Sequence, residues 1–395
     1  MKRTYVLGFL VALFFALQAL PATASGEAPV LAKYYAWYDE NSWGNGKLTD
    51  QPAQPYRSAD RAAIERQVGQ AMSAGIDGFE LNWWGPHNPT DDNLRTLLAV
   101  AQARGFKVTV DFDLSSPFVS GPDDTTQALS YLSQYFASPA WFHLNGRPVV
   151  SFYGVAKYPV STWGAIRSQV GGNALWIGEG DRFAYLDVFD GIHPYSVAWS
   201  PDPSSQLASY AGRTRAYRDK LWVATVMPGY DDTLLGRGAA GFAVDRRNGD
   251  YYRGLWQGAI ATQPAFIAIT SWNEWMEGSQ IEPSRSYGDL YLRITKEMAA
   301  QFRDAALAAR SVNGCAFSSG FATLHDLIPN VVGGCLENEQ HDPANGDALQ
   351  HTTGGLLVWR KADNFTAFTD GARTWVNGPY GLQTRLNTEK FPWEG

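Results

Sequence analysis

Eight short segments rich in β-branched and aromatic residues alternate with amphipathic stretches between residue 29 and about residue 310. The predicted strands cover 30–38, 75–84, 106–113, 147–154, 174–180, 189–196, 221–230 and 265–275. Strands that alternate with helices are typical of repeated β-α-β units, in which the strands run parallel. Eight such units over about 280 residues match the size of one TIM barrel. The sequence therefore predicts an α/β fold, a (β/α)8 barrel.

The stretches between these strands carry apolar residues three or four positions apart, as amphipathic helices do. The repeating residues are Ile64, Val68, Ala71 and Met72 in the first stretch, Leu94, Leu97, Leu98 and Ala101 in the second, and Leu290, Ile294 and Met298 in the last. Gly75 and Gly105 stand where the first two helices are expected to end. A doubly wound open sheet is the alternative architecture, but the first predicted strand lacks the glycine-rich phosphate loop of a Rossmann unit.

The first residues have the pattern of a signal peptide. Lys2 and Arg3 precede an apolar run over 5–20, and Pro21 and the small residues 22–24 follow it. Such a segment is removed on export, so we expect cleavage after about residue 24 and a secreted protein. A membrane anchor is the alternative, but the run is short for a hydrocarbon core of about 30 Å. After cleavage we expect no membrane insertion.

The composition changes after Arg310. Residues 315–395 are rich in Gly, Asn and Thr and contain β-like runs at 354–359 and 365–376. The expected organisation is a signal peptide over 1–24, a catalytic barrel over 25–310 and a small, mostly β module over 315–395, although an extended tail on the barrel is the alternative.

The two cysteines of the chain, Cys315 and Cys335, both fall in this C-terminal part. In an exported protein such a pair is expected to form one disulfide, and two free thiols are the alternative. Closing a loop of this length stabilises a fold by about 3 kcal/mol in the chain-entropy model.

Charge and motifs exclude several functions. The chain has 32 Lys and Arg against 39 Asp and Glu, a net charge of −7, which does not favour binding to nucleic acid or anionic membranes. The six histidines form no HExxH or similar spacing, so we expect no metal and no cofactor. A GxSxG elbow is absent and both cysteines lie outside the barrel, which argues against Ser or Cys nucleophiles. We expect a monomer.

The residues that carry chemistry in a TIM barrel lie at the C-terminal ends of its strands. Carboxylates and aromatic rings dominate these positions here: Tyr34, Tyr35, Trp37, Tyr38, Asn82, Trp83, Trp84, Asp111, Asp113, Tyr153, Glu179, Asp181, His193, Tyr195, Tyr230, Asp231, Asp232, Asn273, Glu274, Trp275 and Glu277. Flat rings beside hydrogen-bonding groups suit the faces of sugars, although aromatic residues also fill ordinary cores. A polysaccharide or oligosaccharide is therefore the expected partner, contacted by Tyr34, Tyr35, Trp83, Trp84, Asp113, Tyr195, Tyr230 and Asn273.

The end of the last predicted strand is the most informative. An apolar run leads directly into SWNEWMEG, which places Glu274 and Glu277 three positions apart at the barrel mouth. A pair of carboxyl groups, one protonated and one ionised, is what glycosidic bond cleavage requires. We predict that Glu277, as the proton donor, has the more strongly raised pKa. A salt bridge to arginine is the alternative role for one glutamate, and Asp111, Asp113 and Glu179 are the next candidates for the catalytic pair.

Five segments in the same order resemble the markers of glycoside hydrolase family 99, the endo-α-mannosidases. They are YYAWY at 34–38, AGIDGFELNWWGP at 74–86, GRPVVSFY at 146–153, PGYDDT at 228–233 and SWNEWMEGSQIEPS at 271–284. The last is the most specific of them. The resemblance covers almost the whole predicted barrel and implies an endo-acting hydrolase that cleaves α-mannosidic bonds with retention and without a metal.

The resemblance also implies residue roles. Glu274 corresponds to the base that removes the proton of the sugar's own 2-hydroxyl to give a 1,2-anhydro sugar, and Glu277 to the acid/base at the departing oxygen. Asn273, Tyr34 and Trp84 correspond to residues that line the sugar site.

The chain departs from the family pattern at two places. Met276 stands where the family usually has His, and DFDLS at 111–115 stands where the family tends to have Glu followed by Pro. These positions bear on which sugar is preferred. The last motif also resembles barrel domains of bacterial polysaccharide-assembly glycosyltransferases. A retaining endo-hydrolase is thus the expected function, with a non-catalytic glycan-binding barrel and a transferase as alternatives.

Overall fold

The computed structural model describes residues 28–393 except 218, 313, 314 and 344. The predicted signal peptide lies outside these residues. In the part of the chain that the structure describes, no helix has the length and apolar character needed to cross a membrane.

Eight parallel strands close into a barrel. They are β1 (Val30–Tyr34), β2 (Gly78–Trp83), β3 (Lys107–Asp113), β5 (Arg147–Tyr153), β6 (Leu175–Glu179), β7 (Gly191–His193), β8 (Leu221–Val226) and β11 (Phe266–Ile269). Each strand pairs with the next along the chain, β11 returns to β1, and β3 pairs with β5. A short strand, β4 (His143–Leu144), adds antiparallel to β5. The predicted (β/α)8 barrel is confirmed, and all eight predicted strands are present.

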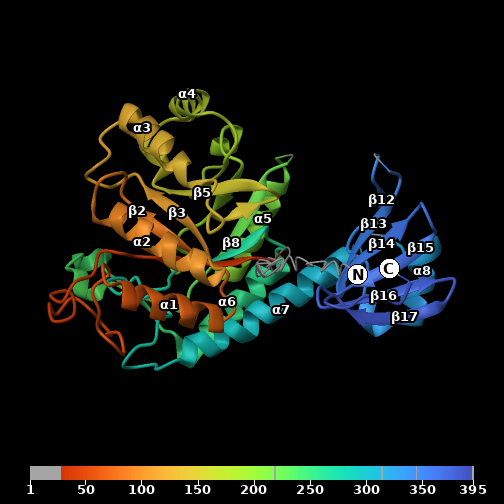
Figure 1. The fold of residues 1–395 in the computed structure, drawn as a ribbon. Helices are drawn as coiled ribbons and strands as arrows, with labels where there is room; N and C mark the ends of the chain where they lie inside the picture. The colour runs from red at the N-terminus through yellow and green to blue at the C-terminus, as the bar shows by residue number, and fades with distance from the viewer. Residues whose placement is uncertain (1–27, 218, 313–314, 344, 394–395) are drawn as a thin grey trace, which may run out of the picture.

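Helices follow the strands around the outside of the barrel (Figure 1). They are α1 (Arg61–Ser73), α2 (Pro89–Arg104), α3 (Pro122–Leu132), α4 (Val160–Val170), α5 (Pro203–Arg215), α6 (Asp250–Ala261) and α7 (Leu290–Val312). The link from β6 to β7 is a 3-10 turn, η3 (Phe183–Asp187), so one unit of the repeat lacks a full helix. Further 3-10 turns are η1 (Ser133–Tyr135), η2 (Val155–Lys157), η4 (Thr233–Leu235), η5 (Gly238–Ala240) and η6 (Arg247–Gly249).

The ends of α2 illustrate why these segments form helices. The Asn88 side chain accepts a hydrogen bond from the amide of Thr90, Pro89 occupies the first turn, and Gly105 ends the helix at φ 71°, as predicted. The predicted apolar face of α1 is correct except at Met72, which is 41% exposed. Met72 lies one position beyond Ala71, so the rotation of 100° per residue carries its side chain to the edge of the buried stripe.

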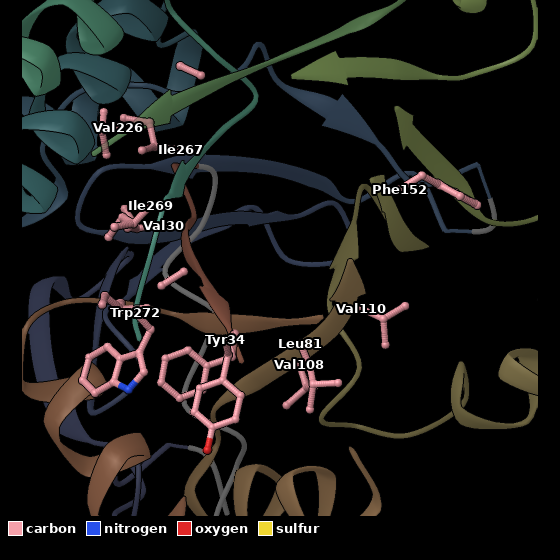
Figure 2. Packing of buried hydrophobic residues seen from close by; sticks show 14 of the residues in the cluster. Val30, Tyr34, Leu81, Val108, Val110, Phe152, Val226, Ile267, Ile269 and Trp272 are labelled. Atoms are coloured by element: carbon pink, nitrogen blue, oxygen red, sulfur yellow. The ribbon is translucent and has the colours of Figure 1, made fainter. Parts of the chain in front are cut away.

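Alternate residues of each strand point into the barrel, where they form layers. The layer near the amino ends of the strands is apolar and consists of Leu31, Val149, Leu175, Ile177, Val223, Phe266 and Ala268 with Phe142. The intervening residues face the helices and form the larger cluster shown in Figure 2, which labels Tyr34, Leu81, Val110, Phe152 and Trp272 among others. This alternation decides which strand-end residues reach the barrel mouth.

The C-terminal part is a separate antiparallel sheet, seen beyond the end of α7 in Figure 1. Its elements are α8 (Ser319–Leu327), α9 (Pro329–Val332), β12 (Gln340–His341), β13 (Ala348–Thr352), β14 (Gly355–Arg360), β15 (Phe365–Thr369), β16 (Arg373–Gly378) and β17 (Gly381–Leu386), with the strands in chain order. The run predicted at 365–376 is therefore two strands joined by a turn at Asp370 and Gly371. Asp370 Oδ1 accepts hydrogen bonds from the amides of Ala372 and Arg373 there.

The sheet has a core of its own, made of Phe321, Leu324, Val332, Ala348, Leu357 and Phe368. Cys315 and Cys335 are joined by a disulfide with an S–S length of 2.07 Å and a Cα–Cα distance of 6.1 Å, so the predicted disulfide is confirmed. Two short strands, β9 (Tyr230–Asp231) and β10 (Ala243–Val244), belong to the loop that follows β8.

Candidate active site

A charged layer lies inside the barrel above the apolar one. Lys33 Nζ is 2.8 Å from Asp111 Oδ2 and 3.3 Å from Glu80 Oε2, and all three side chains are buried. Ser151 donates a hydrogen bond of 2.8 Å to the other oxygen of Glu80. Burial raises the pKa of Asp111 to about 6, while the Lys33 ammonium opposes that rise. This layer is the floor beneath the residues at the barrel mouth.

Glu274 is buried, with 5% of its surface exposed. Its Oε1 accepts hydrogen bonds from the amide of Met276 at 3.2 Å and the hydroxyl of Tyr38 at 3.5 Å. The amide of Glu274 donates to Ser271 Oγ at 2.6 Å, which holds the turn that leaves β11. Burial raises the pKa of Glu274 well above its ordinary value, and the charge of Glu277 raises it further.

The side chain of Glu277 is more exposed than that of Glu274 and contacts both Tyr195 and Arg237. Its Oε2 accepts a hydrogen bond from Tyr195 at 3.2 Å, and its Oε1 lies 3.3 Å from Arg237 Nη2. Burial raises the pKa of Glu277, whereas the Arg237 guanidinium and the Tyr195 hydroxyl lower it. Burial raises the pKa of both glutamates, so the prediction that Glu277 has the more strongly raised pKa stays a prediction. Sequence spacing did not reveal that an arginine from the loop after β8 reaches Glu277.

Arg237 is held in place by its own loop. Its Nη1 is 2.7 Å from Asp232 Oδ2 and 3.2 Å from the hydroxyl of Tyr230, which donates to the same carboxylate at 3.0 Å. The ring of Tyr230 stacks on Phe242 at 4.7 Å. Asp232 is buried and organises this loop, because its Oδ1 also accepts a hydrogen bond of 2.8 Å from the amide of Phe242. Arg237 thus joins Tyr230 and Asp232 to Glu277, which places Tyr230 next to the candidate catalytic pair.

The tyrosines after β1, β5 and β7 face the two glutamates. The hydroxyls of Tyr35 and Tyr195 are 2.7 Å apart, and the rings of Tyr153 and Tyr195 meet edge to face at 5.1 Å. After burial, the charges of Glu274, Asp111 and Glu277 are what raise the pKa of Tyr35, so this hydroxyl lies among all three carboxyls. Tyr35 and Tyr195 thus lie next to Glu277 at the barrel mouth, and their contact with a sugar stays a prediction.

Buried hydrogen bonds hold the segment 271–284, which carries the two glutamates, against the end of β1. Asn273 Oδ1 accepts from the amide of Tyr35 at 2.7 Å, and its Nδ2 donates to the Tyr35 carbonyl at 2.8 Å. Glu282 accepts from Tyr56 at 3.0 Å and from the indole of Trp275 at 3.2 Å. Burial raises the pKa of Glu282 to about 7. Asn273 has no exposed surface, so the prediction that it contacts a sugar is wrong, and it positions the end of β1 instead.

Two further predicted contacts are wrong for one reason. Tyr34 and Trp83 each follow an inward-facing residue, so both side chains point outward and neither has exposed surface. Tyr34 stacks on Phe79 at 4.7 Å and donates to Gln67 at 2.6 Å, and Figure 2 shows it in the packed layer with Trp272. Trp83 donates to Asp91 of α2 at 3.2 Å. Their neighbours Tyr35 and Trp84 reach the mouth instead.

A row of aromatic rings continues from the mouth across the loops after β1, β2 and β3. Trp37 stacks on Trp84 at 5.1 Å, and Trp84 stacks on Phe118 at 6.1 Å. Trp37 and Trp84 are half-buried, and Phe118 is 51% exposed. Phe118 was missed in the sequence because it lies five residues beyond the end of β3, in a loop whose course the spacing does not predict.

Three further strand-end candidates, Asp113, Glu179 and His193, contact groups other than the two glutamates. Asp113 Oδ2 is 3.3 Å from Asn82 Nδ2, and Glu179 Oε2 accepts from the amide of Gly154 at 3.3 Å. Burial raises the pKa of Glu179. His193 is buried, its Nδ1 lies 3.1 Å from the carbonyl of Pro194, and burial lowers its pKa well below the ordinary value. Within the described residues, His, Cys, Asp and Glu form no group with the arrangement of a metal site.

The barrel, including Glu274 and Glu277, is similar in sequence to known proteins. The model of glycosyl hydrolase family 99 matches residues 52–292, which include β2 through β11 and both glutamates. The glycoprotein endo-α-1,2-mannosidases of Xenopus laevis and Rattus norvegicus are 27% and 28% identical over 256 and 270 residues, which are 58% and 60% of this chain. These alignments span 56% and 57% of the relatives, so the chain matches little more than half of their length.

A solved structure shows the same architecture. The endo-α-mannosidase of Bacteroides thetaiotaomicron in complex with bis-tris-propane superposes with a TM-score of 0.64 and 25% identity, over 71% of this chain and 98% of that one. The family match covers more than half of the chain, and it contains the two adjacent glutamates at the mouth of a closed eight-stranded barrel. This chain belongs to glycosyl hydrolase family 99.

Proposed function

We propose that this protein is a retaining, endo-acting hydrolase of an α-linked, mannan-like polysaccharide or oligosaccharide. Glu274 is the base and Glu277 the acid/base. The observation that carries the proposal is the position of these two carboxyls at the barrel mouth: the charge of Glu277 raises the pKa of Glu274, and Glu277 accepts from Tyr195, which is hydrogen-bonded to Tyr35. The similarity to glycoprotein endo-α-1,2-mannosidases supports it.

The reaction follows the route that the family resemblance implies. Glu274 takes the proton of the 2-hydroxyl, O2 attacks C1, and the bond from C1 to the leaving oxygen breaks as Glu277 gives that oxygen a proton. Water then attacks C1 of the 1,2-anhydro sugar, losing a proton to Glu277 while Glu274 returns a proton to O2. Each step inverts C1, so the product retains the original configuration.

The electrostatics of the pair suit these roles. A carboxylate with a raised pKa is a stronger base once it is ionised, and removing a hydroxyl proton requires a strong base. Burial and mutual repulsion favour one shared proton on the pair. A substrate hydroxyl that donates a hydrogen bond to Glu274 favours its ionised form, which leaves the proton on Glu277. Substrate binding is therefore expected to set the protonation states that cleavage needs.

The distribution of aromatic side chains supports an endo mode of action. In the barrel order, β11 lies between β1 and β8, so the glutamates lie between two groups of loops. Trp37, Trp84 and Phe118 belong to the loops after β1 to β3, while Trp199 and Phe242, which are 56% and 37% exposed, belong to those after β7 and β8. Rings on both sides of the bond to be cleaved suit a chain that continues in both directions.

We also propose that the protein is exported. The signal-peptide pattern of residues 1–24 supports this, and so does the disulfide between Cys315 and Cys335, because such bonds persist mainly in oxidising compartments.

The test of the function is incubation with a panel of α-mannans, α-glucans and β-linked polymers, followed by assay of new reducing ends. We expect new ends from an α-mannan, with internal cleavage seen as a rapid fall in polymer size. NMR of the freshly released anomer should show the α configuration. Binding without new ends would favour a non-catalytic barrel, and elongated products would favour a transferase.

We expect Arg237→Gln to move the alkaline limb of the pH profile to higher pH. Arg237 lowers the pKa of Glu277, so its removal lets the acid keep its proton to higher pH. Arg237→Lys keeps the charge and should leave the limb near its original place. Arg253→Gln is the matched control, because Arg253 pairs with Glu297 on the outside of the barrel. A limb that stays fixed in Arg237→Gln would contradict the assignment of Glu277 as the acid.

We expect Trp84→Ala to weaken oligosaccharide binding about tenfold, or about 1.4 kcal/mol, because it removes the central ring of the aromatic row. Calorimetric titration of a Glu277→Gln background, in which substrate is not consumed, measures this affinity. Trp83→Phe is the control, since that ring is buried under α2 and its loss should leave affinity unchanged. Equal affinities for the parent and Trp84→Ala would show that the Trp84 ring does not contribute to sugar binding.

A further inference from the structure

The C-terminal module contains a cavity of about 780 Å³ that lies outside the region matched by the family model. The start of α8, the strands β12 and β14, the turn between β14 and β15, and the end of β16 form its walls. Its residues contribute nothing to the candidate active site. The cavity is large enough for one or two sugar rings, since ligand pockets of about 300–1,000 Å³ are typical for small molecules.

The strand register creates this hollow. Trp359 is paired with Ala348 on one side and with Thr366 on the other, and Thr366 is paired with Asn377. Residues paired in this way project from the same face of a sheet. A large ring therefore stands next to the smaller Thr366 in this row, and Trp359, Thr366 and Asn377 all line the cavity.

The start of α8 closes over the same row. A Cβ on Gly320 would lie 2.4 Å from Thr366 Oγ1, so the first turn of α8 approaches the sheet as closely as only glycine allows. The hydroxyl of Ser318, the residue before α8, donates to Glu339 instead of capping the helix. Within the described residues no side chain caps this end, and the amides of Phe321 and Ala322 donate to the Ser318 carbonyl. The amides of Ser319 and Gly320 are then the donors that the start of α8 offers at the cavity wall.

Trp359 provides a fixed flat surface. Its indole nitrogen donates to Asn364 Oδ1 at 2.8 Å, which sets the orientation of the ring. The side chain is half-buried, and among the described residues no other aromatic ring stacks on it. A ring held in this way at the edge of a polar cavity is suited to pack against the C–H face of a sugar.

The polar groups around the ring are both acceptors and donors. Glu339 and Asp363 supply carboxylate oxygens, and Asn377 and the start of α8 supply N–H groups. His341, 3.6 Å from Glu339, lies at the exposed rim. Arg360 pairs with Asp363, and Glu339 accepts a hydrogen bond from Ser318. The lining is therefore a mixture of donors and acceptors, which matches hydroxyl groups, each of which both donates and accepts.

We propose that this cavity is a second glycan-binding site, which holds a neutral sugar residue of a polysaccharide independently of the barrel. Trp359 stacks on the ring, and the surrounding carboxylates and amides bind its hydroxyls. The module would then keep the enzyme on a polymer while the barrel acts elsewhere on it. The proposal concerns binding alone, so it holds or fails whether or not the barrel hydrolyses the same glycan.

Affinity electrophoresis of the full-length protein tests the site. The protein carries Glu277→Gln to prevent degradation, and the gels contain neutral α-mannan, a neutral α-glucan, an acidic polysaccharide or cationic chitosan. We expect a neutral polymer to retard the protein, and we expect this retardation to persist after Trp84→Ala, which weakens binding at the barrel. In the Trp84→Ala background, Trp359→Ala should lower the affinity for the neutral polymer, as measured from the retardation, at least tenfold.

Two further variants separate binding from folding. Thr323→Arg places a long side chain at the exposed rim of the cavity without altering the sheet, and it should also abolish the retardation. Tyr380→Ala removes a ring that is 65% exposed in the same module but does not line the cavity, and it should have no effect. Unchanged retardation in Thr323→Arg, loss in Tyr380→Ala alone, stronger retardation by chitosan, or retardation that disappears with Trp84→Ala would each overturn the proposal.

Discussion

Glu274→Gln and Glu277→Gln are each expected to reduce turnover of an unactivated α-linked substrate by about 10² to 10⁴, the contribution typical of a positioned acid or base. Gln keeps the shape of the side chain but cannot transfer the proton, so substrate binding should be retained. Initial rates and KM measured on the same oligosaccharide distinguish these effects, because kcat should fall while KM changes little.

A substrate with an activated leaving group separates the two roles. Such a group departs without protonation, so it should restore much of the rate in Glu277→Gln but little in Glu274→Gln. Glu297→Gln is a suitable comparison, since Glu297 pairs with Arg253 on the outside of the barrel. If both active-site Gln variants stayed within about threefold of the parent, well below the loss of a missing acid or base, the pair would have to be sought among Asp111, Asp113 and Glu179.

Lys33→Met is expected to lower the free energy of unfolding by about 3–5 kcal/mol, because it leaves buried carboxylates without their cation. Lys33 contacts Asp111 at 2.8 Å and Glu80 at 3.3 Å, and none of the three has more than 1% of its side chain exposed. Chemical denaturation followed by tryptophan fluorescence measures the change. The effect is large compared with the total stability of about 5–15 kcal/mol that is usual for a domain.

Lys33→Met should lower the free energy of unfolding more at pH 8 than at pH 5. The pKa of Asp111 is already raised to about 6 beside Lys33, and removing the ammonium raises it further. A carboxyl whose pKa is higher in the folded than in the unfolded protein binds a proton on folding, so stability falls as pH rises toward the folded value. The variant Lys33→Met, Glu80→Gln, Asp111→Asn removes all three charges and should regain most of the loss. An equal loss at both pH values would contradict this account.

Local sequence patterns did not predict which residue of each pair, Tyr34 or Tyr35 and Trp83 or Trp84, points into the barrel. Both Tyr34 and Tyr35 end an apolar run, and spacing alone does not distinguish them. The distinguishing signal is Lys33, since a charge inside a strand must face a buried counter-charge, here Asp111. With Lys33 pointing inward, alternation turns Tyr34 outward and Tyr35 inward, and the same parity from Glu80 turns Trp83 outward.

The sequence by itself determined the eightfold alternation, the position of Glu274 and Glu277 after the last strand, and the disulfide of the C-terminal module. These depend on local periodicity, strand ends and residue type, which remain visible in the order of the chain. Only the tertiary structure brought Arg237 to Glu277 and placed Glu282 behind the motif. Arg237 belongs to a long loop whose course depends on packing against Asp232 and Tyr230, and the pKa of each glutamate depends on burial and on charges from other strands. Both are set by distances across the barrel, which spacing along the chain does not encode.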